Sequence, residues 1–478
     1  MKSFIKYSLR LSLLTVAVSS PTAANWPGWR GPEGTGVSPE KNLPTQWNSK
    51  EGVRWHVDLP SPGNSSPIIW GNRVFVTQAL KDENRRTVMC FDRADGKLLW
   101  QSGTTYAEKE STQENNPFCA GTPATDGERV YTCFGSAGVF AYDFTGKELW
   151  HRELGKIEHM FGNAVSPVLY GDLCILNYGP DEKSRLVALS KKTGEIVWEV
   201  QPPQVDPDEN PPMRFGGPGG PGGRGPGGPD GGPGARGPGG PAQAGPDGGR
   251  PPGGPGGPPP AGRGGRGGGG GSWSTPIVIK AGGHDELVVN FPNRLAAYNP
   301  TTGKQLWLSK GIGGSIHATP AWGDGALVAM SSGPGGGNAI AVKPGGTGDV
   351  TESQRIWRLE RVKSNMGSGV IYEGHFYSVS QDGIAACLDL KDGSMVWEER
   401  LKGPGTRGSS WSSTLLSDGK IYVPNQSGDV FVLRASPKFE VLATNSVGES
   451  SNASLAASDG QVFMRTDKGL WCFGVASK

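Results

Sequence analysis

The feature of this chain that most restricts its fold is a phrase of ten or eleven residues that recurs at least five times. Each copy opens with Ala or Cys, carries Thr-Gly or Asp-Gly near its middle, and ends in Trp. The copies occupy residues 90–100, 141–150, 188–198, 297–307 and 387–397. Thr-Gly and Asp-Gly supply the positive φ that a tight hairpin turn requires, so each copy predicts a strand, a turn and a second strand.

A second predicted hairpin precedes each phrase, and in five copies its first strand follows Ser-Pro or Thr-Pro. These dipeptides begin at Ser66, Thr122, Ser166, Thr275 and Thr319, and weaker copies of the hairpin run through 369–377, 413–423 and 454–463. Two hairpins give four strands per unit, and eight units fill the chain at about 48 residues each once the signal segment and the insert described below are removed. We therefore predict an all-β fold, an eight-bladed β-propeller of four-stranded antiparallel blades.

The two ends of the chain complement each other. The eighth unit stops after Trp471, Cys472 and Phe473, at the third strand, without a closing Trp strand. Residues 53–59, which contain Trp55, have the sequence of that missing strand, so the N-terminal strand is predicted to complete the last blade and close the ring. The Trp residues predicted to pack the blades or close the ring are Trp55, Trp100, Trp150, Trp198, Trp307, Trp357 and Trp397.

Composition divides the chain into five segments. They are a signal peptide (1–24), an N-terminal extended segment (25–52), blades 1–3 (53–200), a disordered insert (201–271) and blades 4–8 (272–478). The first segment carries Lys2, Lys6 and Arg10 before an apolar run that is too short to span a bilayer, a pattern typical of a secretory signal rather than of a membrane helix. We expect a periplasmic or secreted monomer without a transmembrane anchor.

The insert consists mainly of Gly, Pro and Arg and cannot build a core. It enters between blades 3 and 4, where a solvated spacer and a basic tether for an anionic surface remain alternatives. The 47 basic and 45 acidic residues of the chain include the three cations of the signal peptide, so the mature protein is nearly neutral. This balance argues against nucleic acid as a partner.

Six Cys residues in an exported chain raise the question of disulfides. Cys90, Cys387 and Cys472 occupy the slot that holds Ala in the other phrases, so they are predicted to be small core residues. Cys119 and Cys133 could form a disulfide across a hairpin, although a shift of one residue in register would separate them. No Cys/His spacing typical of a metal site occurs in the sequence, and no metal is predicted.

The phrase Ala-x-Asp-x-x-Thr-Gly-x-x-x-Trp resembles the repeat of the pyrroloquinoline quinone (PQQ) dehydrogenases and their non-enzymatic relatives. The opening around Asn25, Trp26, Trp29 and Arg30 resembles the start of exported PQQ-like propellers common in planctomycete-type bacteria. The enzyme branch implies a quinone on the ring axis between a Trp and an adjacent-Cys disulfide, with Ca²⁺ held by Glu and Asn and with an Asp base. Trp273 alone matches this set and no adjacent Cys pair exists, so no cofactor and no catalytic residue are predicted.

The non-enzymatic branch resembles the propeller subunit of the outer-membrane protein assembly machinery, which binds partners through its surface loops. This resemblance implies a binding or protein-assembly scaffold. Two alternatives remain open: a PQQ- and Ca²⁺-dependent oxidoreductase that acts on alcohols or sugars, and a carbohydrate-binding propeller.

The residues just before each predicted inner strand should line the mouth of the central channel. The candidate ligand-binding residues are Asn64, Asn163, Trp273, His317, Asn365, Arg407, Trp411 and Asn452, with Asn115, Asn116 and His159 beside them. Amides supply paired donors and acceptors and Trp supplies a stacking face, a combination that suits a glycan or a protein partner. The same side chains could instead serve the fold by bonding backbone groups around the channel.

Overall fold

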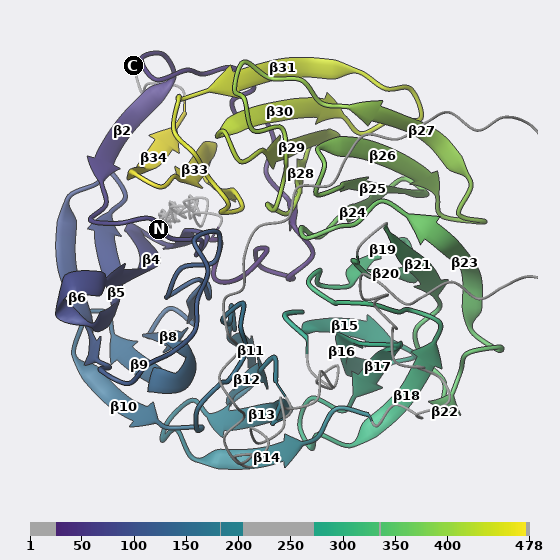
Figure 1. Cartoon of the computed structure of the whole chain (residues 1–478), viewed down its shortest axis with the longest axis horizontal. Helices are drawn as coiled ribbons and strands as arrows, with labels where there is room; N and C mark the ends of the chain where they lie inside the picture. Colours follow the sequence, from purple (N-terminus) through teal and green to yellow (C-terminus); the bar gives the residue numbers. More distant parts are fainter. Residues whose placement is uncertain (1–24, 182, 204–271, 334–335, 475–478) are drawn as a thin grey trace, which may run out of the picture. The chain divides into compact units, whose positions relative to one another are not determined.

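The computed structural model describes residues 25–181, 183–203, 272–333 and 336–474. Eight sheets stand in chain order around a common centre (Figure 1). This confirms the predicted all-β fold, an eight-bladed propeller built from four-stranded antiparallel blades. The predicted signal peptide and most of the predicted insert lie outside the described residues. Within the described ranges, no helix has the length and apolar character needed to cross a bilayer.

Blades 1 to 4 run from an inner to an outer strand. Blade 1 comprises β3 (Ile68–Trp70), β4 (Arg73–Leu80), β5 (Arg85–Asp92) and β6 (Leu98–Thr105), with a 3₁₀ turn η1 (Lys81–Glu83). Blade 2 comprises β7 (Ala124–Thr125), β8 (Arg129–Cys133), β9 (Val139–Asp143) and β10 (Glu148–Arg152), with η2 (Gly135–Ala137). Blade 3 comprises β11 (Val168–Tyr170), β12 (Leu173–Tyr178), β13 (Arg185–Ser190) and β14 (Ile196–Val200). Blade 4 comprises β15 (Ile277–Ala281), β16 (His284–Phe291), β17 (Arg294–Tyr298) and β18 (Gln305–Lys310), with β22 (Gly348–Asp349) parallel to β18.

Blades 5 to 8 repeat the pattern. Blade 5 comprises β19 (Ala321–Gly323), β20 (Ala326–Met330), β21 (Gly337–Val342) and β23 (Arg355–Val362). Blade 6 comprises β24 (Val370–Tyr372), β25 (His375–Val379), β26 (Ile384–Asp389) and β27 (Met395–Arg400). Blade 7 comprises β28 (Leu415–Ser417), β29 (Lys420–Pro424), β30 (Asp429–Arg434) and β31 (Val441–Ser446), with β1 (Val37–Ser38) parallel to β28. Blade 8 comprises β32 (Ala456–Ser458), β33 (Gln461–Arg465), β34 (Gly469–Phe473) and β2 (Val53–Asp58).

The N-terminal strand β2 completes blade 8, as the sequence predicts. It pairs antiparallel with β34 in a register that sets Trp55 opposite Cys472. Trp100 and Cys90 stand in the same relation in blade 1. Trp55 is buried and its Nε1 donates to the carbonyl oxygen of Arg93 in blade 1 at 2.7 Å. This contact ties the last blade to the first and closes the ring without an open sheet edge between them.

Outer-strand Trp residues dock on the turn of the following blade. Trp100 lies against Gly146 and donates from Nε1 to the carbonyl oxygen of Phe144 at 3.0 Å. Gly146 has φ 88°, and a Cβ there would lie 2.7 Å from the Trp100 ring, so this glycine serves both the hairpin and the docking. The Trp residues that donate in the same way to the next blade are Trp55, Trp150, Trp198, Trp357 and Trp397.

Trp307 departs from this rule. Its Nε1 donates at 2.8 Å to Glu286 Oε2 within its own blade. The cause is the connection from β21 to β23 in blade 5, which replaces the short Gly hairpin with a longer excursion that lays β22 beside β18. Trp307 is nevertheless fully buried, so it still packs the blade as predicted.

The hydrophobic core lies in layers between neighbouring blades. Cys90, Cys387 and Cys472 are fully buried in these layers, as their Ala-like slot predicts. Cys119 and Cys133 are free thiols, so the possible disulfide between them is not formed. Cys119 packs in the layer between blades 1 and 2 and Cys133 in the layer between blades 2 and 3, so the sheet of blade 2 lies between the two core layers. Burial raises the pKa of both thiols to about 12.

Candidate functional site

A belt of Ser and Thr hydroxyls links the blades at the mouth of the channel. The belt residues lie two positions before an inner strand, and the backbone N–H of one donates to the hydroxyl of its counterpart in the next blade. Ser66 N donates to Thr122 Oγ1 at 2.9 Å, and Thr122 N donates to Ser166 Oγ at 3.0 Å. The same bond joins Thr319 to Ser368, Ser368 to Ser413, Ser413 to Ser454 and, across the closed ends, Ser454 to Ser66. The hydroxyls of three Ser-Pro or Thr-Pro motifs, and of three serines without a following Pro, therefore hold the inner edge of the ring.

Residues 26–38, called here the axial segment, occupy the centre of the ring (Figure 1). Trp26 pairs through its backbone with Ile69 on the free edge of β3. Trp29 Nε1 donates to Thr319 Oγ1 of blade 5 at 3.0 Å. The end of the segment, β1, pairs with the inner strand β28 of blade 7. The chain's own N-terminal region therefore fills the axis, in a stretch that the sequence marks only as extended.

Arg30 is the polar centre of the axial segment. It is buried, and its guanidinium donates to the carbonyl oxygens of Ser368 and Gly369 in blade 6 at 3.1 and 2.6 Å. It also donates to the carbonyl oxygens of Thr35 and, at 3.5 Å, of Thr414 in blade 7. Burial lowers the pKa of Arg30 to about 9, which still leaves it charged at neutral pH. A buried cation whose two Nη atoms donate to carbonyl oxygens fixes the segment to blades 6 and 7.

The loop between β6 and β7, residues 106–123, gathers two of the predicted mouth amides. The carbonyl oxygen of Asn115 accepts from Asn64 Nδ2 at 2.8 Å and from Asn452 Nδ2 at 3.4 Å. Gln426 Nε2 donates to Asn452 Oδ1 at 2.9 Å. Asn64 of blade 1 and Asn452 of blade 8 thus meet on a loop that leads into blade 2. Both side chains bond the protein itself, which is the structural role left open by the sequence.

Glu110 anchors the same loop. Its Oε1 accepts from Ser136 N, Ser136 Oγ and Asn163 Nδ2 at 3.1, 2.8 and 3.2 Å. Its Oε2 lies 3.8 Å from Arg86 Nη2, and both side chains are buried. The Arg86 guanidinium in turn lies 3.7 Å from the centre of the Phe118 ring. The predicted residue Asn163 is therefore part of a buried polar network that sets the position of the loop.

Trp273, His317 and His159 form an aromatic group at the mouth. The rings of Trp273 and His317 are stacked with centroids 4.8 Å apart, and His159 meets Trp273 edge to face at 4.6 Å. Burial, with a smaller contribution from His159, lowers the pKa of His317 to about 4, and burial also lowers the pKa of His159. Both imidazoles are therefore neutral at pH 7, which allows them to pack against the indole without a charge to solvate.

His317 is connected to Asn365 through Ser332. Ser332 Oγ donates to the carbonyl oxygen of Asn365, so the hydroxyl oxygen is left to accept from His317 Nδ1, 3.3 Å away. Neutral His317 consequently carries its proton on Nδ1. Asn365 is 2% exposed; its Nδ2 donates to Met330 Sδ at 3.0 Å, while its Oδ1 has no hydrogen-bond partner within the described part of the chain.

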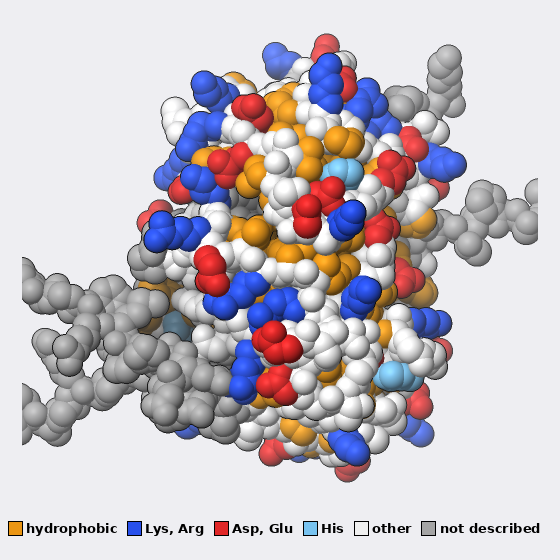
Figure 2. All heavy atoms as spheres, turned by 90° about the vertical axis from the view of Figure 1, so that its right-hand side faces the viewer, with side chains coloured by type: hydrophobic (Ala, Val, Ile, Leu, Met, Phe, Trp, Pro, Cys, Tyr) orange, Lys and Arg blue, Asp and Glu red, His pale blue; other side chains and the backbone are white. Residues whose placement is uncertain are grey.

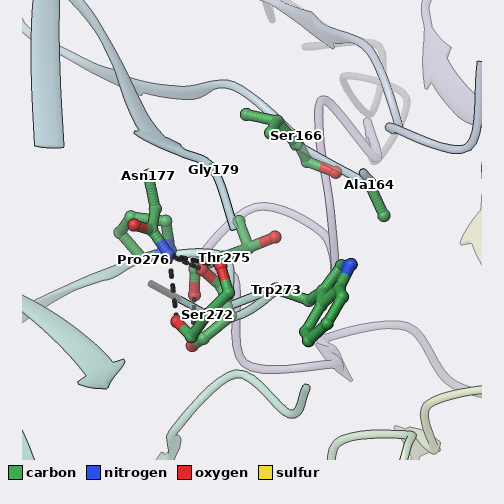
Figure 3. Close-up of a pocket in the computed structure, with 10 residues that line it drawn as sticks. Ala164, Ser166, Asn177, Gly179, Ser272, Trp273, Thr275 and Pro276 are labelled. Carbon is green, nitrogen blue, oxygen red and sulfur yellow. Dashed lines mark hydrogen bonds between the residues drawn. The ribbon is translucent and has the colours of Figure 1, made fainter. Parts of the chain in front are cut away.

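The other two predicted mouth residues stand apart from these groups. Arg407 is exposed and is held by its backbone N–H, which donates to Ser427 Oγ at 2.8 Å, and Trp411 is half-buried. The hollow beside Trp273 is lined by Asn177 and Ser272, which are bonded to each other, and it has no room for a water molecule (Figure 3). The predicted residues thus form separate bonded groups around the mouth and not one pocket.

Sequence reasoning missed two exposed large hydrophobic side chains that lie together outside the repeat. Met160 is 64% exposed and Phe161 is 50% exposed, in the loop between β10 and β11 next to His159. The remaining large exposed hydrophobics lie where outer strands begin, as the repeat places apolar residues before Trp: Leu98, Leu99, Leu149, Ile196, Val197, Met395 and Val441. Met160 and Phe161 match no position of the repeat, and that departure is the signal that could have found them.

A family model described as outer membrane protein assembly factor BamB matches residues 37–156, 84–214 and 292–478. The chain belongs to this family. Among solved structures, this BamB-family propeller is similar to BamB from Moraxella catarrhalis, with a TM-score of 0.53 and 12% identity over 88% of this chain and 97% of that one. The computationally designed Ika8 protein gives the same TM-score and identity over 88% and 99% of the two chains. At these identities the likeness shows the fold alone.

A quinohemoprotein alcohol dehydrogenase from Comamonas testosteroni is more distant, with a TM-score of 0.43 and 13% identity over 95% of this chain and 81% of that one. No curated protein sequence matches the chain significantly. The fold and the family are therefore shown, while the ligand or partner has to be inferred from the residues of this BamB-family propeller.

The residues on the axis do not fit the PQQ and Ca²⁺ site that the enzyme branch implies. The hydroxyls at the strand starts accept hydrogen bonds from backbone N–H groups of neighbouring blades, and the axial segment brings the cation Arg30 to the centre. Within the described ranges, no group of three or more His, Cys, Asp or Glu side chains could hold a metal ion. The Cys residues are separate free thiols, and His317 covers one face of Trp273, the residue that matched the quinone site in sequence.

Proposed function

We propose that this BamB-family propeller is a non-enzymatic exported scaffold that binds a protein partner at the mouth of the ring through Met160 and Phe161. The observation that carries the proposal is the exposure of these two side chains, 64% and 50%, on a loop whose backbone is fixed. Apolar side chains gain free energy when a partner removes them from water, and exposed apolar points within a polar surround mark interaction sites.

Three hydrogen bonds hold this exposed pair in place. Gln113 Nε2 donates to the carbonyl oxygen of Met160 at 2.9 Å, and Asn116 Nδ2 donates to that of Phe161 at 2.8 Å. Trp273 Nε1 donates to the next carbonyl oxygen along the loop at 3.2 Å. Because the backbone is ordered before binding, docking costs little further ordering entropy. In this proposal, the mouth amides and Trp273 position the apolar pair and do not themselves recognise the ligand.

The partner should offer an apolar pocket for a thioether and a phenyl ring, with polar groups around it that face Gln113 and Asn115. The description of the family as an assembly factor of the outer membrane agrees with a protein partner. An exported location follows from the same proposal, because residues 1–24 have the composition of a secretory signal.

The test is a pull-down from the exported fraction of the native host with the wild type and with the double variant Met160→Ser, Phe161→Ser. We expect a partner retained by the wild type to be lost about tenfold or more with the double variant. Leu149→Ser is the matched control, because Leu149 is also exposed but lies at a repeat position. Equal capture by the double variant would overturn the proposal, and a chain lacking residues 204–271 measures any contribution of the insert separately.

Two further ligands test the alternatives. Calorimetry with PQQ and Ca²⁺ should give no heat of binding, and micromolar affinity with dye-linked alcohol oxidation would replace the scaffold by an oxidoreductase. Saturable binding of an oligosaccharide that is lost in the double variant Trp273→Ala, Trp411→Ala would instead identify a carbohydrate-binding propeller.

A further inference from the structure

A groove of about 820 Å³ opens between blades 5 and 6. Its walls are β23 of blade 5 and β26 and β27 of blade 6, and its apolar lining includes Leu359, Ile384, Ala386 and Met395. Figure 2 faces the side of the ring where Figure 1 places β23 and β27, and shows hydrophobic side chains exposed across its middle with charged side chains around them. The volume lies within the range of about 300–1,000 Å³ typical of ligand sites.

The groove exists because one packing slot of blade 6 holds a small residue. The slot faces the previous blade and precedes the third-strand residue that pairs with the outer Trp, or with Ala443 in blade 7. In chain order it holds Met89, Phe140, Val187, Ala296, Ile340, Ala386, Phe431 and Trp471. Ala296 is fully buried, because the blade 3–4 layer also contains Val200 and Tyr298. Ala386 remains partly exposed in the groove.

A buried acceptor lies at the end of the groove nearest the mouth. Asn365 lines the groove and is 2% exposed, and its Oδ1 has no hydrogen-bond partner among the residues that the structure describes. An unpaired buried amide oxygen costs about 1–3 kcal/mol, which a donor from a bound ligand would recover. Ser364, Ser380 and Gln381 lie beside it and make this end polar.

The rim carries charges of both signs. Arg361 and Lys363 stand on the blade 5 side, and Asp382 and Glu398 stand on the blade 6 side. None of these four side chains forms an ion pair within the described part of the chain. Opposed walls of opposite sign favour a ligand that itself carries both charges along its length.

These features select one class of occupant. The lining contains no aromatic side chain, whereas glycan sites stack sugars on aromatic rings. A fatty acyl chain offers no donor to Asn365 and no partners for a rim of both signs. A peptide offers backbone N–H donors, an apolar side chain for the floor and charges of either sign. Met330 and Met395 line the groove as well, and methionine surfaces adapt to varied peptide side chains.

We infer that the groove between blades 5 and 6 binds an extended peptide segment of a partner protein, with one large apolar side chain on the Ala386 floor and flanking residues of opposite charge. The surface lies apart from Met160 and Phe161, so the inference stands or falls independently of the proposed function.

The test uses the mature chain labelled with ¹³C at the methionine methyl groups. The probes are acetyl-Lys-Ser-Leu-Ser-Glu-amide, the same peptide with Lys and Glu exchanged, and both peptides with Ser in place of Leu. We expect at least one Leu peptide to shift the Met330 and Met395 methyl signals with a Kd below about 1 mM, while the matched Ser peptide does not. Met89 and Met464, buried in another layer, serve as internal references that stay unshifted.

Ala386→Phe supplies the decisive variant, because Phe140 and Phe431 hold the same slot in blades 2 and 7. We expect this variant to fold and to bind the peptide about tenfold or more weakly. Ala386→Leu, with a smaller side chain, should also fold and weaken peptide binding. Glu398→Lys should change which charge order binds better. Absence of shifts with both Leu peptides, equal binding by Ala386→Phe, or shifts with cellohexaose or dodecanoate but not with the peptides would each overturn the inference.

Discussion

The layer between blades 8 and 1 and the layer between blades 5 and 6 have the same Trp contact but differ in how completely they are filled. Both are docked by a Trp on a turn glycine, Trp55 on Gly96 and Trp357 on Gly393. Beyond this dock, Met89 fills the slot of the first layer, whereas Ala386 leaves the slot of the second open. Both layers also carry a belt bond, Thr319 to Ser368 and Ser454 to Ser66, so the slot can vary while these shared contacts hold the neighbouring blades together.

At the mouth of the ring, the two layers also differ in how far their buried polar groups are hydrogen-bonded. Arg465 is fully buried between blades 8 and 1 and donates to Ser65 Oγ, Thr77 O and Gln78 Oε1 at 2.6, 2.6 and 2.8 Å. Asn365 is equally enclosed between blades 5 and 6, yet its Oδ1 has no partner among the described residues. The Arg465 guanidinium thus has three protein acceptors and lacks a partner only at Nε, whereas the acceptor of Asn365 has none, so the blade 8–1 layer satisfies its buried polar group more completely than the blade 5–6 layer does.

The largest expected effect compares the two docking Trp residues. Trp55→Ala should lower the free energy of unfolding by about 3–5 kcal/mol, because it opens a cavity in a sealed layer and releases the strand that closes the ring. Trp357→Ala should cost less, about 2–4 kcal/mol, because its layer already opens on a hydrated groove. Urea denaturation followed by Trp fluorescence measures both. Equal losses, or an unchanged midpoint for Trp55→Ala, would remove the distinction between the layers.

The second comparison concerns the mouth ends. Arg465→Met should destabilise the protein by about 2–4 kcal/mol, because Gln78 Oε1 loses its donor and Thr77 O loses its shorter hydrogen bond in a buried site. Asn365→Leu should stay within about 1 kcal/mol of the wild type, because it removes an amide that is only half satisfied. Chemical denaturation of both variants at pH 7 checks the pair. A larger loss of stability for Asn365→Leu than for Arg465→Met would contradict the conclusion that the blade 8–1 layer satisfies its buried polar group better than the blade 5–6 layer does.

The repeat made the eight blades and their closure predictable because the relevant contacts are encoded locally. A turn Gly and an outer Trp recur within each phrase, and the docking of Trp100 on Gly146 repeats between blades. Trp307 is the exception, and its different contact depends on β22, which pairs with β18. Because β22 lies more than one strand further along the chain, the phrase that ends in Trp307 gives no sign of it. The axial segment was equally hidden, because Arg30 finds Ser368 across 338 positions of the chain.

For the mouth residues, position in the repeat indicates where a side chain lies but not which partner it bonds. The positions of Asn64 and Asn452 before inner strands could be read from the repeat, but their shared partner, Asn115, lies on a loop outside it. The same limit applies between the blades, because position in the repeat does not reveal how tightly a side chain is packed. Ala296 and Ala386 hold the same slot, and only the residues that pack around them from elsewhere decide that one is sealed and the other open.

A third comparison uses pH. The pKa of His317 is about 4 in the folded protein, below its ordinary value of 6.5. Above pH 6.5 both states are neutral and the difference has no effect; as the pH falls from 6.5 to 4, the unfolded state takes up the proton first and stability is lost, by up to about 3 kcal/mol. His317→Phe keeps the stack on Trp273 and should abolish this part of the pH dependence. An identical dependence of stability on pH for His317→Phe and the wild type would refute the assignment.

The smallest expected effects come from filling the packing slot in the two blades where it holds Ala, at Ala296 in blade 4 and at Ala386 in blade 6. Ala296→Phe should destabilise the protein by about 1–3 kcal/mol, because the ring enters a layer already filled around Val200 and Tyr298. Ala386→Phe should leave the free energy of unfolding unchanged or raise it, because the ring covers apolar groups that now face water in the groove. Thermal and urea unfolding of the two variants give opposite signs if the blade 5–6 layer is open in solution. A loss of stability in both would mean that the groove is closed in solution, and would remove the physical basis for a peptide site there.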